Sequence, residues 1–146
     1  MTSKLDGNIR DGRHIMPIRV YYEDTDFSGV VYHASYLRFM ERGRTNYLRL
    51  LGADQRALFA GDDDMAGVAF VVRHMEIDFR KSAQMDDVLD VVTFPAEVRG
   101  ASLTLAQEVR RGGDVLIEAK VKVACVSNGR ARRIPLALRK VMGADG

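Results

Sequence analysis

The densest group of polar side chains lies between Glu23 and Gly29 and reads EDTDFSG. Carboxylates can act as general bases or nucleophiles, although Asp, Ser and Gly are also typical of solvated turns. A carboxylate beside a helix N-terminus lies near backbone N–H groups that can polarise a bound carbonyl. One carboxylate and one such amide could hydrolyse a thioester, because a thiol with a pKa of about 8.5 leaves without strong protonation.

The same segment begins like a calcium-binding loop, but its later part does not fit. Asp24, Asp26, Ser28 and Gly29 loosely fill the first, third, fifth and sixth positions of such a loop. The twelfth position should supply a bidentate Glu, and here it is Ser35. We therefore do not expect calcium binding.

Other catalytic motifs are absent from the sequence. There is no nucleophile elbow, phosphate-binding loop, H-E-x-x-H pair or dinucleotide fingerprint. The histidines are not spaced for chelation on one element, so we expect no metal site: His14, His33 and His74. The single cysteine, Cys125, excludes an internal disulfide and is expected to be a small core residue. The net charge of +2 gives no indication of nucleic-acid binding.

The length of 146 residues predicts a single domain over residues 1–146, with a flexible lead at residues 1–16. No apolar stretch approaches the roughly 18 residues of a transmembrane segment. A lone cysteine suits a reducing compartment. We expect a cytoplasmic protein, and loose association with the inner membrane stays open.

The elements around the polar segment follow from hydrophobic periodicity. Alternation predicts a strand at Pro17–Glu23, and helical spacing predicts one long helix from Tyr36 onward. Ser35 is the expected N-cap and Gly52 the expected C-terminal stop. Gly43, within the apolar stripe of this helix, predicts a close approach of the helix backbone to its neighbours.

The rest of the chain has strand character. An acidic loop is expected at residues 60–65, and strands are expected near residues 67–80, 87–98, 102–111 and 114–127. Gly112-Gly113 and Asn128-Gly129 are typical of hairpin turns, because these residues accept a positive φ. The order of one strand, one long helix and four strands predicts an α+β fold in which an antiparallel sheet curls over the helix.

A long ordered motif spans the polar segment and the predicted helix. It reads VYYEDTD at residues 20–26 and GVVYHASY at residues 29–36, and it continues through Phe39, Glu41-Arg42 and Arg44-Thr45. This pattern resembles the hotdog-fold acyl-CoA thioesterases. It is most similar to the YbgC branch, which is associated with the Tol-Pal system and related to 4-hydroxybenzoyl-CoA thioesterase. The similarity covers most of residues 17–135, including FVVR at residues 70–73.

The resemblance implies a fold, an assembly and roles for several residues. The fold would be a hotdog, with a five-stranded antiparallel sheet wrapped around one long central helix. The assembly would be a homodimer or homotetramer with active sites at the subunit interface. Asp26 matches the catalytic carboxylate, as nucleophile or general base. The backbone amide of His33 matches the group that polarises the thioester carbonyl, and the His33 side chain could assist the substrate or water. Tyr32 and Tyr22 would form pocket walls or pack at the subunit interface.

Other candidate binding residues lie further along the chain. Glu41 could line the acyl pocket or act chemically, although a structural ion pair is the alternative interpretation. Arg99 could meet the phosphates of coenzyme A, as could three arginines near the C-terminus, or these side chains could form a solvated face: Arg130, Arg132 and Arg133. The related pattern often has Glu where this chain has Asn46, which leaves the acyl preference open.

The resulting hypothesis is an acyl-CoA thioesterase that releases a carboxylic acid and free coenzyme A, with no cofactor beyond the coenzyme A of its substrate. A hotdog dehydratase of 3-hydroxyacyl thioesters is one alternative, and it would release no thiol. A non-catalytic module that binds acyl-CoA or acyl carrier protein is another, and it would show no turnover. Acyl length, the thiol carrier and any Tol-Pal partner stay open at this point.

Overall fold

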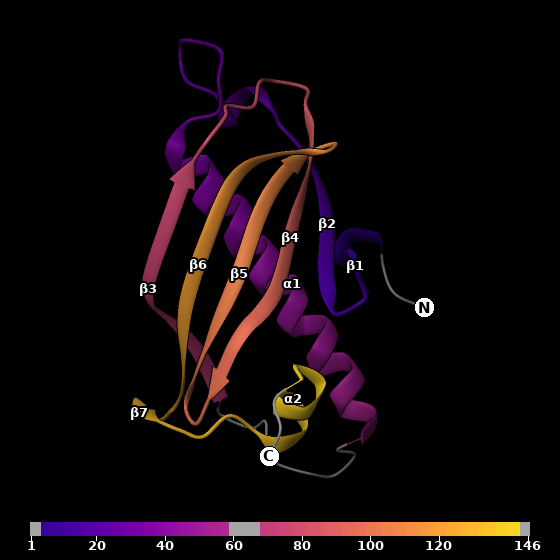
Figure 1. Cartoon of the computed structure of the whole chain (residues 1–146), viewed down its shortest axis with the longest axis vertical. Helices are drawn as coiled ribbons and strands as arrows, with labels where there is room; N and C mark the ends of the chain where they lie inside the picture. Colours follow the sequence, from indigo (N-terminus) through magenta and orange to yellow (C-terminus); the bar gives the residue numbers. More distant parts are fainter. Residues whose placement is uncertain (1–3, 59–67, 144–146) are drawn as a thin grey trace.

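One long helix lies against a curved antiparallel sheet in the computed structural model, which describes residues 4–58 and 68–143 (Figure 1). The long helix is α1 (His33–Leu58), and a short helix, α2 (Leu136–Val141), contacts it near the C-terminus of the chain. The acidic loop expected at residues 60–65 lies outside the described residues. Neither helix of the described part has the length and apolarity needed to cross a membrane.

The described residues contain seven strands in one sheet. Five are long, as the resemblance implied, and two short strands are additional. The neighbour order is β1-β2-β4-β5-β6-β3, and β7 pairs with β6. The strands are β1 (Asn8–Arg10), β2 (Arg13–Arg19), β3 (Val68–Phe79), β4 (Val88–Arg99), β5 (Ser102–Arg111), β6 (Asp114–Ser127) and β7 (Arg130–Ala131). The α+β hotdog architecture is therefore confirmed.

The four later strands lie within a residue or so of their predicted bounds. Burial alternates clearly in β5, where Leu103, Leu105 and Val109 are buried on the helix side. The hairpin turns are also as predicted. Gly112 has φ +59°, and Asn128 has φ +53°, a conformation that Gly and Asn adopt at low cost.

The N-terminal prediction was wrong, because ordered structure begins well before residue 17. β1 and β2 occupy much of the expected flexible lead, and β2 ends at Arg19, ahead of a short 3-10 turn at Tyr22–Asp24. The inward face of β2 starts with His14, which is fully buried and does not count as apolar in a hydropathy pattern. The ring Nε2 of His14 is 2.7 Å from the carbonyl oxygen of Asp6, and burial lowers the pKa of His14.

The bounds predicted for the long helix were also wrong at both ends. The helix begins at His33, so Ser35 lies in its first turn and is not the N-cap. The Ser35 hydroxyl donates a hydrogen bond to the backbone oxygen of Asp24, 3.0 Å away, and this bond joins the helix to the preceding loop. Gly52 does not stop the helix, which continues to Leu58. A glycine inside a helix costs about 1 kcal/mol, which the neighbouring turns can offset.

The close approach predicted at Gly43 is confirmed. A Cβ atom at this position would lie 2.7 Å from Val91 Cγ1 and 3.2 Å from Thr93 Oγ1. Both neighbours are buried side chains of β4. Only a residue without a side chain allows the helix backbone to lie this close to the sheet.

A buried glutamine on β5 fixes the helix at the same level. The Gln107 Nε2 donates to the Met40 carbonyl oxygen and to Thr93 Oγ1, each at 2.9 Å. Its Oε1 accepts a hydrogen bond from Arg44 Nη1 at 3.0 Å. The buried amide is therefore bonded at both ends, which offsets the cost of its burial and sets the register of α1 on the sheet.

We predict that Gly43→Ala lowers the free energy of unfolding by about 1–3 kcal/mol, because the added methyl group overpacks the contact with Val91. Gly52→Ala is the matched control, since no atom of the described residues outside the neighbouring helix backbone lies within 4 Å of its Cβ position. This variant should gain about 0.5–1 kcal/mol from helix propensity. Urea denaturation measures both changes, and a Gly43→Ala variant as stable as the wild type would contradict the packing argument.

Candidate active site

Asp26 lies in a tight turn just before α1. Its backbone N–H donates to the Val30 oxygen at 2.9 Å, and the Gly29 N–H donates to the Asp26 oxygen at 3.1 Å. Gly29 has φ +87°, which the turn requires. The side-chain Oδ1 of Asp26 accepts hydrogen bonds from both the Ser28 amide, at 2.8 Å, and the Ser28 hydroxyl. The turn therefore holds the carboxylate in a defined orientation.

The same contacts favour the ionised form of this carboxyl group. The hydrogen bonds from the hydroxyl and the amide of Ser28 lower the pKa of Asp26, and a smaller electrostatic effect of His33 acts in the same direction. An ionised carboxylate is the form that a nucleophile or a general base requires.

Backbone hydrogen bonds join the Asp26 turn to the start of α1. The Tyr32 N–H donates to the Asp24 oxygen at 2.9 Å, and the Ser35 hydroxyl donates to the same oxygen. These bonds place the turn beside the first helical residue, His33. The first amides of a helix have no acceptor within the helix, so the His33 N–H is free to meet a ligand oxygen.

The segment between β3 and β4 is hydrogen-bonded both to the loop that follows Asp26 and to the start of α1. The Val31 N–H donates to the Ala83 oxygen at 2.9 Å, and the buried Tyr36 hydroxyl accepts a hydrogen bond from the Ala83 amide at 2.8 Å. Val30 forms an isolated bridge with Gln84. The loop, the helix start and this segment thus form one hydrogen-bonded unit.

Two aromatic side chains contact the ring of His33. The ring of His33 meets the Phe79 ring edge to face, with centroids 5.0 Å apart, and lies 6.3 Å from the Tyr32 ring. Phe27 is fully exposed, Tyr32 and Tyr22 are exposed, and Phe79 is 45% exposed. The exposed positions of Tyr22 and Tyr32 are compatible with pocket walls.

Sequence reasoning missed Phe79 as a member of this site. No local signal identifies Phe79, which lies at the end of β3 and meets His33 only after the chain folds.

The structure does not bring the two other candidate residues next to Asp26 within one chain. Glu41 lies eight residues after His33, about 12 Å along the helix. It lies on the rim of a groove between β2 and α1. Its charge acts on Arg44, whose pKa is lowered mainly by burial and raised by Glu41. Arg99 ends β4 at the far end of the sheet, where it pairs with Glu97.

Neither a metal site nor a reactive cysteine is found elsewhere in the described part of the chain. No group of three or more His, Cys, Asp or Glu side chains within residues 4–58 and 68–143 is arranged to hold a metal ion. Cys125 is fully buried on β6, and burial raises the pKa of its thiol. The expectation that Cys125 is a core residue is confirmed.

Comparison with known proteins defines the class. The family model described as "Thioesterase superfamily" matches residues 28–118, which include His33 and the whole of α1. The chain belongs to the thioesterase superfamily, and it is a thioester hydrolase with the hotdog fold.

Its relatives narrow the class further. The acyl-CoA thioesterase YbgC of Haemophilus influenzae is 45% identical over 92% of this chain and 94% of its own length. A crystal structure of a probable thioesterase from Bartonella henselae has a TM-score of 0.70 at 41% identity, and it covers 86% of this chain and all of that one. A 4-hydroxybenzoyl-CoA thioesterase variant, bound to 4-hydroxybenzoyl-CoA, shares the fold with a TM-score of 0.75 at 20% identity, over 90% of this chain and 99% of its own.

We predict that Ser28→Ala raises the pKa of Asp26 toward its ordinary value, because the hydroxyl bond is the largest cause of the lowered pKa. Since the ionised form is the reactive one, the low-pH limb of activity should move to higher pH. Carbon-13 NMR titration of the Asp26 carboxyl group measures this pKa directly. Ser28→Thr keeps the hydroxyl and should keep the lowered pKa, whereas an unchanged pKa in Ser28→Ala would contradict the assignment.

Proposed function

We propose that this protein hydrolyses acyl-CoA thioesters to a carboxylic acid and free coenzyme A, with Asp26 and the His33 amide as its reacting groups. The observation that carries the proposal is the Asp26 carboxylate, which Ser28 orients in a turn that is hydrogen-bonded to the first turn of α1. Relatives named acyl-CoA thioesterase and acyl-CoA thioester hydrolase support the substrate class and favour hydrolysis over dehydration or binding alone.

The proposed step uses groups that the chain supplies. The thioester carbonyl oxygen accepts a hydrogen bond from the His33 N–H, which makes the carbonyl carbon more electrophilic. Asp26 then either attacks this carbon and forms an anhydride that water cleaves, or removes a proton from the attacking water. In both routes the C–S bond breaks and the thiolate of coenzyme A takes up a proton. No cofactor beyond the coenzyme A of the substrate is needed.

Tyr32 is proposed to form a wall beside the reacting carbonyl, because its exposed ring lies next to His33. We assign Glu41 and Arg99 to substrate binding only within an assembly of subunits, since one chain places both away from Asp26. In that arrangement Glu41 would line an acyl pocket. Arg99 would bind the phosphates of a coenzyme A molecule whose acyl group lies in the active site of a neighbouring subunit.

We propose a homodimer or homotetramer because a long strand, β3, lies at one edge of the described sheet. β3 is a terminal strand that pairs with β6 on one side, and its outer edge has no partner among the described strands. Val71 and Val72 on this strand are both exposed. A long edge strand with exposed apolar side chains is a template for pairing with a second chain. The lone, unpaired cysteine and the coenzyme A substrate support a cytoplasmic location.

Thiol release from short, long and aromatic acyl-CoAs tests the proposed reaction. Asp26→Asn should lower turnover at least a hundredfold, within the roughly 10²–10⁴-fold range of general-base catalysis. Asp24→Asn is a matched control, because an amide oxygen can still accept the bond that the Tyr21 amide donates to Asp24, and it should stay active.

Both variants should keep the circular dichroism spectrum and the oligomeric state of the wild type. Near-full activity of Asp26→Asn would contradict the catalytic assignment, and a monomer by light scattering would contradict the edge-strand proposal. If thiol is released only from acyl groups on acyl carrier protein, then this carrier protein, and not coenzyme A, is the thiol carrier of the substrate.

A further inference from the structure

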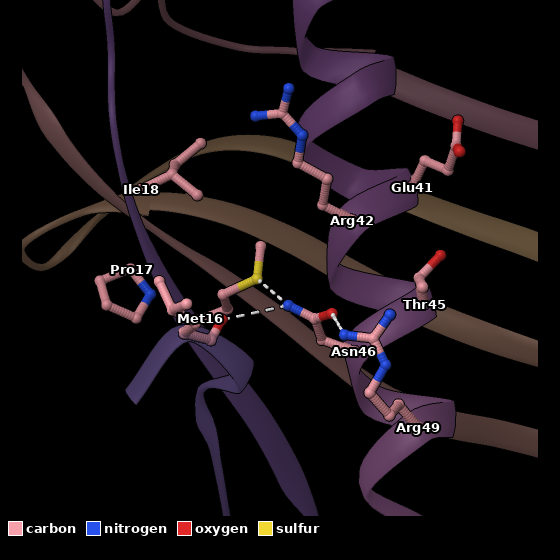
Figure 2. A pocket seen from close by; sticks show the side chains of 9 residues that line it. Met16, Pro17, Ile18, Glu41, Arg42, Thr45, Asn46 and Arg49 are labelled. Atoms are coloured by element: carbon pink, nitrogen blue, oxygen red, sulfur yellow. Dashed lines mark hydrogen bonds between the residues drawn. The ribbon is translucent and has the colours of Figure 1, made fainter. Parts of the chain in front are cut away.

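A groove of about 600 Å³ lies between β2 and the outward side of α1 (Figure 2). One wall is apolar and comes from the N-terminal segment and β2: Leu5, Met16, Pro17 and Ile18. The opposite wall is polar and comes from the helix: Glu41, Arg42, Thr45, Asn46 and Arg49. A cavity of this volume is large enough for a small organic ligand.

This groove is separate from the Asp26 site within the same chain. Nine residues, or about two and a half helical turns, separate Arg42 from His33. The two side chains therefore leave the helix on opposite sides. His33 meets Phe79 of the edge strand β3, whereas the groove opens toward β2, four positions away in the sheet order.

The groove is held in shape by hydrogen bonds at its lower end. Asn46 Nδ2 donates to the Leu5 carbonyl oxygen at 3.2 Å and lies 3.0 Å from the Met16 sulfur (Figure 2). Arg49 pairs with Asp6 at 3.3 Å and also donates to Asn46 Oδ1. These bonds tie the N-terminal segment to the helix, so the end wall of the groove is built before any ligand arrives.

One cationic side chain in the groove has no partner among the described residues. Arg49 is engaged by Asp6, and the charge of Glu41 acts on Arg44 one turn along the helix. The Arg42 guanidinium forms no ion pair or hydrogen bond with a described residue, and it extends toward the Ile18 side of the groove (Figure 2). The upper end of the groove therefore offers a free cation beside an apolar wall.

We propose that this groove is a second ligand site, which binds a single-chain carboxylate amphiphile. Its carboxylate would pair with Arg42, because a guanidinium matches a carboxylate through two parallel hydrogen bonds. Its alkyl chain would lie along Met16, Pro17 and Ile18 and remove apolar surface from water. This ligand class is also the product class of an acyl thioester hydrolase, so the groove would take up released acid away from Asp26.

Decanoate is the probe, and backbone amide NMR signals of the full chain report where it binds. Decanoate should shift the signals of Ile18, Arg42 and Asn46, whereas acetate, which has the head group alone, should leave them in place. Arg42→Glu should raise the dissociation constant at least about fivefold, a modest change because the side chain is exposed. Arg38→Glu, the same charge change one turn earlier on an exposed position, should leave it unchanged.

Three results would overturn this inference: decanoate shifts confined to the neighbourhood of Asp26 and His33, equal affinity of Arg42→Glu and the wild type, or groove signals that change with protein concentration alone. The last result would mean that a second copy of the chain occupies the groove. The binding measurement needs no turnover. Its outcome is therefore distinguishable from a failure of the proposed hydrolysis.

Discussion

The close contact between Gly43 and β4 sets the position of α1, and the site depends on that position. Because Gly43 has no side chain, the helix backbone lies against Val91 and Thr93. Gln107 of β5 donates a hydrogen bond to the carbonyl oxygen of Met40 in the same part of the helix. An α-helix is stiff along its length, so fixing it at this level also fixes its first turn, about 15 Å away along the axis. His33 therefore has one position relative to the sheet.

Backbone groups provide most of the geometry from which the proposed chemistry follows. The Asp26 turn is bonded to the first turn of α1 through the Asp24 oxygen, and the Ala83 segment closes the unit from the other side. The hydrogen bonds of Ser28 orient the Asp26 carboxyl group and lower its pKa. A thioester requires little more than this pairing of a carboxylate with a polarising amide, because its leaving group is a weakly basic thiolate.

The sequence predicted the later strands well and the N-terminal half less well. β3 to β6 are rich in apolar and β-branched residues, and Gly and Asn turns separate the later ones, so their bounds depend on local signals. β2 was placed too late because its inward face begins with His14, and the helix was started too late because Ser35 resembles an N-cap. The bond from Ser35 to Asp24 that replaces a cap is a tertiary contact, which local propensity does not encode.

The candidate active site also combines residues that a local motif identifies with residues that only tertiary contacts bring together. Asp26 and His33 are close in the chain, so a motif could identify them together. Their aromatic neighbour Phe79 is distant in sequence, and only the pairing of β3 with β6 brings it to the helix start. Glu41 and Arg99 were grouped with Asp26 by resemblance, whereas helix rise and strand length separate them from Asp26 within one chain.

Infrared spectroscopy of a bound substrate tests the central claim most directly. An acyl-CoA labelled with carbon-13 at the thioester carbonyl would be bound to Asp26→Asn, so that the ester survives the measurement. The account predicts a carbonyl stretch at lower frequency than in buffer, because the His33 amide polarises the C=O bond. A carbonyl frequency equal to that in buffer would contradict the account, since the helix start would then not act on the thioester.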